Sequence, residues 1–300
     1  MTSDFWRGAL ALAVVMFCLF SENAATAQQA PAVSAPNGKI EFDAGALNLP
    51  GPIFMARAAG TVTVPIGERF GLQADLSAST APGFITTGAL HLFTRDPAAY
   101  LIGGTLGFVR SPGATVLAAG PEAEVYLDRW TLEAWGGVAV AYPTAAAMPN
   151  RVGPFVMTNA AYYVTENWRL SLGVSWLDSY GALQVGSEYL IEGLAMPAAV
   201  TTELRLGQDG ALRATLGLRG YVGPTPHKSL ILRHREDDPA DRSMALYSAA
   251  GGQTIQGTPS TAAASSGAPD TNGEGGDSGE QVERDPRCDL DPPPAFIPCD

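Results

Sequence analysis

Short segments in which apolar and polar residues alternate follow one another from about Ile53 to Val222. Residues 168–176 show the pattern most clearly, because every second residue is apolar and a Trp stands at each end. Successive side chains of a β-strand point to opposite faces, so one face of this strand is apolar between two indoles. Membrane-spanning β-barrels carry such an apolar band between two aromatic girdles.

Tight turns divide the chain into twelve candidate strands. They are residues 38–47, 55–64, 70–79, 86–94, 100–109, 115–127, 130–142, 155–165, 168–177, 183–191, 198–206 and 211–222. We therefore predict an all-β fold, an antiparallel up-and-down transmembrane β-barrel. Bacterial single-chain barrels have an even number of strands, so we expect twelve, with ten open if the weakest segments do not pair.

Aromatic residues flank four of the predicted turns. Alternate turns of an up-and-down barrel lie at the same rim, so these aromatics are expected to form one girdle. The flanking residues are Phe70, Phe93, Tyr100, Tyr126, Trp130, Tyr163 and Trp168.

The first 27 residues have the pattern of a secretory signal peptide. Arg7 precedes an apolar run at residues 9–20, and Ala25-Thr26-Ala27 offers a small-residue cleavage site. The run is shorter than the roughly 20 residues of a transmembrane helix. We expect cleavage before Gln28, loss of Cys18 with the signal, a linker over residues 28–37, a barrel over residues 38–223 and a location in the cell outer membrane.

The charge of the chain limits its partners. Residues 50–222 hold 23 charged residues among 173, about 13%, whereas soluble domains have about 25%. The low charge favours contact with outer-membrane lipid. With an acidic balance and no basic patch, nucleic-acid binding is not expected. We also expect an encounter with the barrel-assembly machinery during insertion.

Residues 224–300 have a different composition. From residue 223 onward the chain has 6 Lys and Arg against 13 Asp and Glu, a net charge of −7, and residues 251–279 are rich in Gly, Ser, Thr and Ala. We predict an acidic, disordered periplasmic tail beyond a protease-resistant core that ends near residue 223–240. The tail would be a spacer or would bind a periplasmic or cell-wall partner. Cys288 and Cys299 are expected to form a local disulfide, with free thiols as the alternative.

The polar face of the strands supplies candidates for the barrel lumen. These residues would form either a packed ion-pair network or the wall of a polar conduit for small solutes. The lumen-lining candidates are Gln73, Asp75, His91, Glu122, Glu124, Glu133, Arg169, Glu188, Glu203, Arg205, Arg213 and Arg219.

Two other functions stay open. His91 is the one His of the predicted barrel, and a barrel-embedded lipid hydrolase or acyltransferase would pair such a His with a Ser. A soluble secreted or periplasmic β-barrel binding protein would turn the apolar face inward. We expect no enzyme activity, no metal site and no cofactor, because nucleophile-elbow, phosphate-loop and dinucleotide motifs are missing from the sequence.

Three segments carry a resemblance to known proteins. Residues 91–97 (HLFTRDP), 162–173 (YYVTENWRLSLG) and 228–239 (KSLILRHREDDP) resemble segments of poorly characterised exported barrel proteins of alphaproteobacteria. The resemblance covers about residues 55–239 and implies an outer-membrane β-barrel with no catalytic residues. The chain is also similar to small porin-like proteins. These usually end on an aromatic last strand, whereas here 78 residues follow the candidate ending at Val222.

Overall fold

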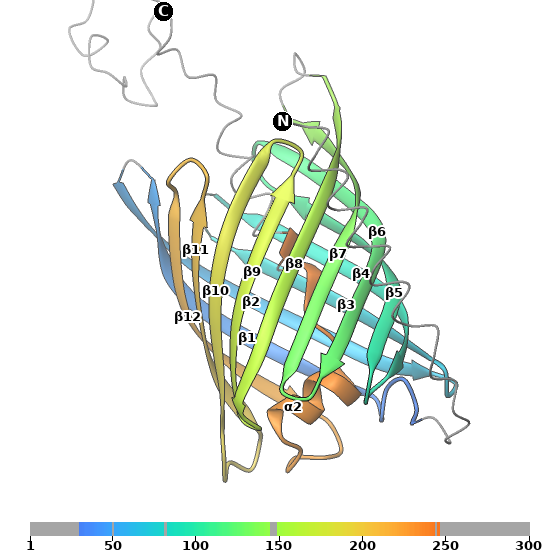
Figure 1. The fold of residues 1–300 in the computed structure, drawn as a ribbon. Coiled ribbons are helices and arrows are strands. Elements are labelled where there is room, and N and C mark those ends of the chain that lie inside the picture. The colour runs from blue at the N-terminus through green and yellow to red at the C-terminus, as the bar shows by residue number, and fades with distance from the viewer. Residues whose placement is uncertain (1–29, 50, 81–82, 145–148, 244, 247–300) are drawn as a thin grey trace, which may run out of the picture. The chain divides into compact units, whose positions relative to one another are not determined.

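Twelve antiparallel strands close into a barrel in the computed structural model, which describes residues 30–49, 51–80, 83–144, 149–243 and 245–246 (Figure 1). The predicted fold class and the predicted number of strands are confirmed. The strands are β1 (Asn37–Leu49), β2 (Gly51–Ile66), β3 (Phe70–Ser79), β4 (Ile85–Asp96), β5 (Tyr100–Arg110), β6 (Ala114–Leu127), β7 (Trp130–Pro143), β8 (Arg151–Thr165), β9 (Trp168–Leu177), β10 (Tyr180–Ile191), β11 (Ala198–Gly207) and β12 (Leu212–Val222). Among the described residues, no helix is long and apolar enough to cross a membrane.

The barrel closes between its first and last strands. Gly38 of β1 lies opposite Val222 of β12, and the antiparallel ladder continues to Asn48 and Leu212. Closure pairs the backbone of every strand on both sides and leaves no open sheet edge. We call the end where β1 begins and β12 ends the terminal mouth, and the opposite end the distal mouth.

Alternation along each strand separates the two faces of the wall. On β1, Phe42 is 63% exposed on the outer face, whereas its neighbours Glu41 and Asp43 are buried on the inner face. On β9, Leu172 and Val174 face outward while Ser175 is buried inside. The outer face of the barrel is therefore apolar, and much of the inner face is polar.

The predicted aromatic girdle is only partly right. Phe70, Trp130 and Trp168 are exposed at the outside of the terminal mouth. Phe93 and Tyr163 are buried inside, as is Tyr126. Each of these three has the parity of the inward residues on its own strand, and position along the strand decides which face a side chain occupies.

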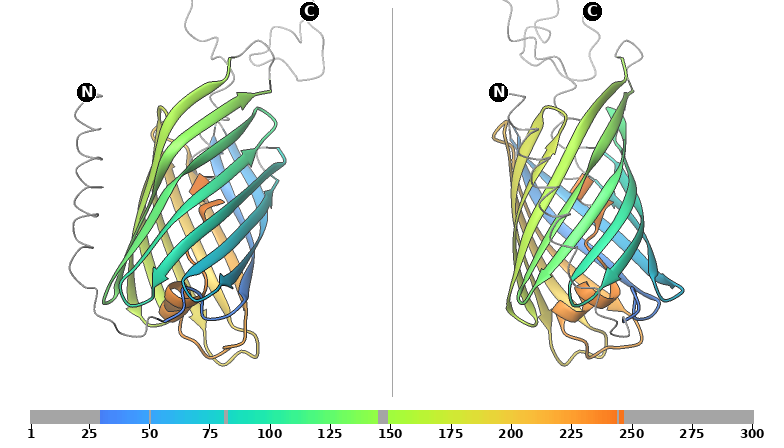
Figure 2. Two further views of the ribbon diagram at one scale, coloured as in Figure 1. Left: turned by 90° about the vertical axis from the view of Figure 1, so that its right-hand side faces the viewer. Right: turned by 45° about the vertical axis from the view of Figure 1, so that its right-hand side comes forward.

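The chain does not leave the barrel after β12. It turns back into the terminal mouth through α2 (Leu230–Leu232) and η1 (Arg233–Asp237), and then continues inside the barrel. Figure 2 shows this orange stretch enclosed by the strands. We call the described residues 224–243 and 245–246 the luminal segment.

The luminal segment runs from the terminal mouth toward the distal mouth. The Leu230 amide donates to the Asn167 side chain at the β8–β9 turn, which lies at the terminal mouth. Further along, Leu246 packs in a cluster with Ile85 at the start of β4 and Leu177 at the end of β9, which lie toward the distal mouth. Leu246 therefore lies deeper in the barrel than Leu230.

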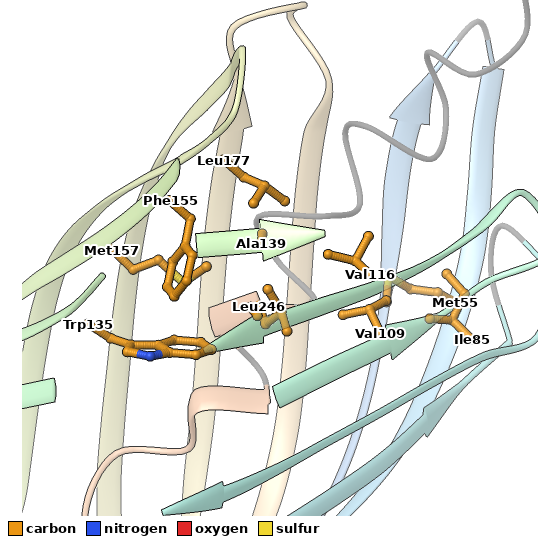
Figure 3. Packing of buried hydrophobic residues seen from close by; sticks show 11 residues of the cluster. Met55, Ile85, Val109, Val116, Trp135, Ala139, Phe155, Met157, Leu177 and Leu246 are labelled. Carbon is orange, nitrogen blue, oxygen red and sulfur yellow. The ribbon is translucent and has the colours of Figure 1, made fainter. Parts of the chain in front are cut away.

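Leu246 closes an apolar patch on the inner wall (Figure 3). The patch is built from β2 and β4–β9, and the edge of the Phe155 ring faces Trp135 at 4.7 Å between centroids. Burial of such a patch against Leu246 removes apolar surface from water and favours docking of the segment. The buried members of the patch are Met55, Ile85, Val109, Val116, Ala118, Trp135, Ala139, Phe155, Met157, Leu177 and Leu246.

These contacts move the predicted domain boundaries. The proposed tail was expected to begin at residue 224, but its described part packs inside the barrel, because charged and apolar wall residues find their partners there. The described part of the predicted linker also packs at the terminal mouth, where Ala32 and Val33 are buried. The signal peptide, residues 251–279, Cys288 and Cys299 lie outside the described residues.

Candidate functional site

The inner face of the barrel holds the twelve residues predicted for the lumen. Nine of them are buried, namely Gln73, Asp75, His91, Glu122, Glu124, Glu133, Glu188, Arg205 and Arg213. Arg169, Glu203 and Arg219 are half-buried and form ion pairs with inward residues. Their part in conduction remains a prediction.

An ion-pair network joins the first and last strands across the closure. Arg219 of β12 donates to Glu41 of β1 and, through Nη1, to Glu188 Oε2 of β10 at 2.7 Å. Arg57 of β2 donates to Glu41 Oε1 at 2.7 Å and pairs with Asp43. Removal of one partner from such a buried network leaves an uncompensated charge, so the network ties the closing strands together.

A second network surrounds His91. Its Nε2 lies 2.8 Å from Asp75 Oδ2, and its Nδ1 lies 3.2 Å from Glu122 and 3.2 Å from Thr105 Oγ1. The His91 side chain is 0% exposed. A carboxylate on each side and complete burial make this His a bridge between β3 and β6.

Arg242 of the luminal segment joins the carboxylates of β6 and β7. Its Nε donates to Glu122 Oε2 at 2.9 Å and its Nη2 donates to Glu124 Oε1 at 3.1 Å. Its Nη1 lies 3.6 Å from Glu133 Oε2. Burial opposes the charge, but the three carboxylates raise the pKa of Arg242 above its ordinary value.

Other charges fasten the luminal segment at the terminal mouth. Lys39 Nζ donates to Asp238 Oδ2 at 2.7 Å. Arg95 donates to the backbone carbonyls of Ala32 and Asp237 at 2.8 and 3.0 Å. Arg235 donates to the backbone carbonyl of Asp128 at 2.7 Å, in the β6–β7 turn.

His234 is held in a neutral form at the same mouth. Its Nδ1 lies 2.8 Å from the Tyr163 hydroxyl oxygen, and its Nε2 lies 3.5 Å from Glu188. Burial, helped by the nearby Arg169, Lys39 and Arg219, lowers the pKa of His234 to about 3 although Glu188 opposes the shift.

A polar cavity of about 190 Å³ remains beside the luminal segment. His234, residues 239–242 and Ala245 of the segment form one side, and β1, β2 and β6–β12 form the other. Charged members of the wall include Arg57, Arg169 and Arg219. Between them lie the uncharged polar residues Ser171, Ser175, Gln184 and Thr201.

Site residues that were missed from the sequence include Arg57 and Arg95 as well as two groups. The first is Lys39, Glu41 and Asp43 on β1, whose spacing of two between Ile40 and Phe42 is a usable signal for an inner face. The second is the luminal segment with Arg242, which has no local signal because its partners are more than a hundred residues away.

The chain is only distantly similar to proteins of known structure. No protein-family model and no curated protein matches the chain. Among solved structures, the KdgM porin in complex with disordered oligogalacturonate is similar at 10% identity over 61% of this chain and 98% of that chain, with a TM-score of 0.44. The COG4313 outer membrane channel from Pseudomonas putida F1 is similar at 12% identity, covering 67% and 99%, with a TM-score of 0.45.

A further similar structure is the translocator domain of the autotransporter NalP from Neisseria meningitidis. It shares 12% identity, covers 74% of this chain and 96% of that chain, and has a TM-score of 0.40. These values are too low to transfer a solute or an activity. The closed antiparallel barrel with an apolar outer face is, by its own geometry, of the outer-membrane type.

Proposed function

We propose that this protein is an outer-membrane β-barrel that conducts small polar solutes along a narrow path beside its own luminal segment. The observation that carries the proposal is the polar cavity between that segment and strands β6–β12, β1 and β2. A completely packed ion-pair network would leave no such space. A cavity of about 190 Å³ is large enough to hold several water molecules.

The outer surface supports the membrane location. Large apolar side chains such as Leu76 and Leu216 are more than half exposed on the outer face of the barrel. A soluble protein would bury them, since exposed apolar patches of this extent are costly in water. The alternative of a soluble barrel with its apolar face inward is therefore wrong. We also propose that the chain is related to the exported barrel proteins of alphaproteobacteria that it resembles.

The geometry around His91 does not support a lipid hydrolase. The partners of its ring are Asp75, Glu122 and Thr105, and the His91 side chain is completely buried. It is not among the residues that line the cavity. A substrate in the lumen could not reach it, and we assign His91 to the ion network and no enzyme activity to the barrel.

A cavity-filling substitution tests the conduit. Ser171 of β9 lines the cavity, whereas the next residue, Leu172, faces the lipid. Ser171→Trp in the mature full chain is expected to lower single-channel conductance in planar bilayers, because the indole occupies the path. Leu172→Trp is the matched control and is expected to leave conductance unchanged. Absence of current steps from the unmodified chain under every salt condition would reject the conduit.

A further inference from the structure

The contact between Arg242 and the barrel wall uses every nitrogen of the guanidinium group. Nε faces Glu122 at 2.9 Å, Nη2 faces Glu124 at 3.1 Å and Nη1 faces Glu133 at 3.6 Å. A guanidinium is a planar fork with donors in fixed directions, whereas an ammonium is a compact point charge. Three carboxylates arranged around one fork therefore match a guanidinium better than an ammonium.

The three carboxylates belong to strands of the barrel wall, whereas the Arg242 guanidinium belongs to the luminal segment. Glu122 and Glu124 are two residues apart on β6, and Glu133 of β7 lies directly opposite Glu124 in the ladder. Like charges opposite each other on adjacent strands are destabilising. The wall thus presents a cluster that requires a cation, and Arg242 supplies it from a segment outside the sheet.

We propose that Glu122, Glu124 and Glu133 form a guanidinium-binding site in the lumen, which Arg242 occupies here and which a small guanidinium-bearing solute such as arginine can take in its place. The site would make guanidinium compounds a solute class for the proposed conduit. Binding at the site does not depend on conduction, whereas passage of such a solute through the barrel rests on the proposed function.

Access to the site is from the cavity. Glu124, Glu133 and Arg242 all line the cavity described above. A solute in the cavity therefore meets two of the three carboxylates and the group that occupies them. Exchange then requires withdrawal of the Arg242 side chain, which opens the way to the buried Glu122.

The three carboxylates differ in how much they depend on Arg242. Glu133 also accepts a hydrogen bond from Arg169 at 2.7 Å, and Glu122 also contacts His91. Glu124 also accepts a hydrogen bond from the uncharged Tyr126 hydroxyl, at 3.1 Å. Glu124 is therefore the carboxylate for which loss of the guanidinium matters most, and the residue to remove in a control.

Chemical rescue of Arg242→Ala tests the site. The mature full chain with this substitution is refolded in detergent, and its thermal unfolding is followed with added arginine, lysine or sodium chloride at equal ionic strength. Arginine is expected to raise Tm at about tenfold lower concentration than lysine, the factor expected for one additional charge-assisted hydrogen bond. The unmodified chain, with its site filled, is expected to show no difference between arginine and lysine.

The double variant Arg242→Ala/Glu124→Gln is the control and is expected to lose the preference for arginine. Equal effects of arginine and lysine on Arg242→Ala, or the same arginine preference in the unmodified chain, would overturn the proposal. If Arg242→Ala does not reach the barrel form alone, the same comparison is made on refolding yield, where equal yields with both amino acids would overturn it. Because Tm does not depend on conduction, failure of this site is distinguishable from failure of the conduit.

Discussion

Arg219 connects three strands at the point where the barrel closes. It bonds Glu41 on β1 and Glu188 on β10 from its own position on β12. Tyr221, two residues further along β12, also donates to Glu188. A single guanidinium therefore bridges two carboxylates inside the barrel, and Arg57 adds a second positive charge beside Glu41.

We predict that Arg219→Ala destabilises the barrel by about 3–5 kcal/mol, the usual cost of removing one partner from a buried ion pair. The measurement is urea unfolding of the refolded chain, followed by Trp fluorescence. Arg110→Ala is the control, because Arg110 is exposed at the distal end of β5 and its removal should change stability by no more than about 0.5 kcal/mol. Equal effects of the two substitutions would contradict the assigned network.

His234 gives a pH prediction for the docked luminal segment. Its pKa is lowered to about 3 inside the barrel, mainly by burial. Above about pH 6.5 the side chain is neutral both docked and free, so no penalty applies. As pH falls below that value, His234 binds a proton in the undocked segment but stays unprotonated in the docked segment. The free energy of docking therefore weakens by up to about 1.4 kcal/mol per pH unit.

The test compares the unmodified chain with His234→Asn in urea unfolding across this pH range. The comparison isolates the contribution of His234, because the carboxyl groups titrate in both chains and their effect cancels. The stability advantage of the unmodified chain is expected to shrink as pH falls from about 6.5 to 4. An advantage that grows on acidification would mean that the ring is charged and stabilised by Glu188.

At the residue scale, the sequence was informative wherever parity on a strand decides the direction of a side chain. His91 and Glu122 could be placed inside for this reason, and the same rule applied to Phe93 would have removed it from the girdle. Arg242 could not be predicted, because its position depends on a chain reversal after β12. The composition of residues 224–300 predicted a disordered tail, so no contact of Arg242 with the barrel was expected.

At the element scale, β6 and β7 approach closely where their ladder is interrupted. Ala119 pairs with Val138 and Glu122 pairs with Trp135, but residues 120–121 and 136–137 have no partners in the ladder between these strands. A Cβ on Gly120 would lie 2.0 Å from the Gly136 carbonyl oxygen. Only a residue without a side chain fits here.

We therefore expect Gly120→Ala to destabilise the barrel by about 1–3 kcal/mol, since the neighbouring backbone must move. Gly104→Ala on β5 is the control, because a Cβ there meets no atom within 4 Å. Heat-modifiability on gels and urea unfolding report the difference. If Gly104→Ala proved as harmful as Gly120→Ala, the close approach of β6 and β7 would not be the cause.

The strands themselves were predicted well because their signal is local. The expected strand at residues 168–177 is β9 as observed, and the weak candidate at residues 38–47 became β1 (Asn37–Leu49). The observed β4 (Ile85–Asp96) and β8 (Arg151–Thr165) extend beyond their predicted ends, since ladder pairing continues past the point where alternation in sequence fades. The ends of a strand can therefore be predicted only when its partner strand is known, whereas the existence of each strand could be predicted from its own sequence.

At the scale of the whole molecule, the barrel wall carries opposite charges on its inner face, and the luminal segment offers both signs to it: Arg242 meets wall carboxylates and Asp238 meets Lys39. Arg242 meets Glu122, Glu124 and Glu133, Leu246 meets the apolar patch, and the cavity remains between the segment and strands β1, β2 and β6–β12. Closure and strand number followed from local pattern and parity. The filling of the lumen did not, because it depends on contacts between residues distant in sequence.

The central claim is that solutes pass beside a luminal segment that narrows the barrel. Single-channel conductance of the mature full chain tests it most directly when the chain is compared with Arg242→Glu. The new carboxylate would repel the wall carboxylates that now hold the segment, so the segment should leave its position and the current steps should become larger. Unchanged steps in a variant that still folds as a barrel would contradict the account, because the luminal segment would then not determine the width of the path.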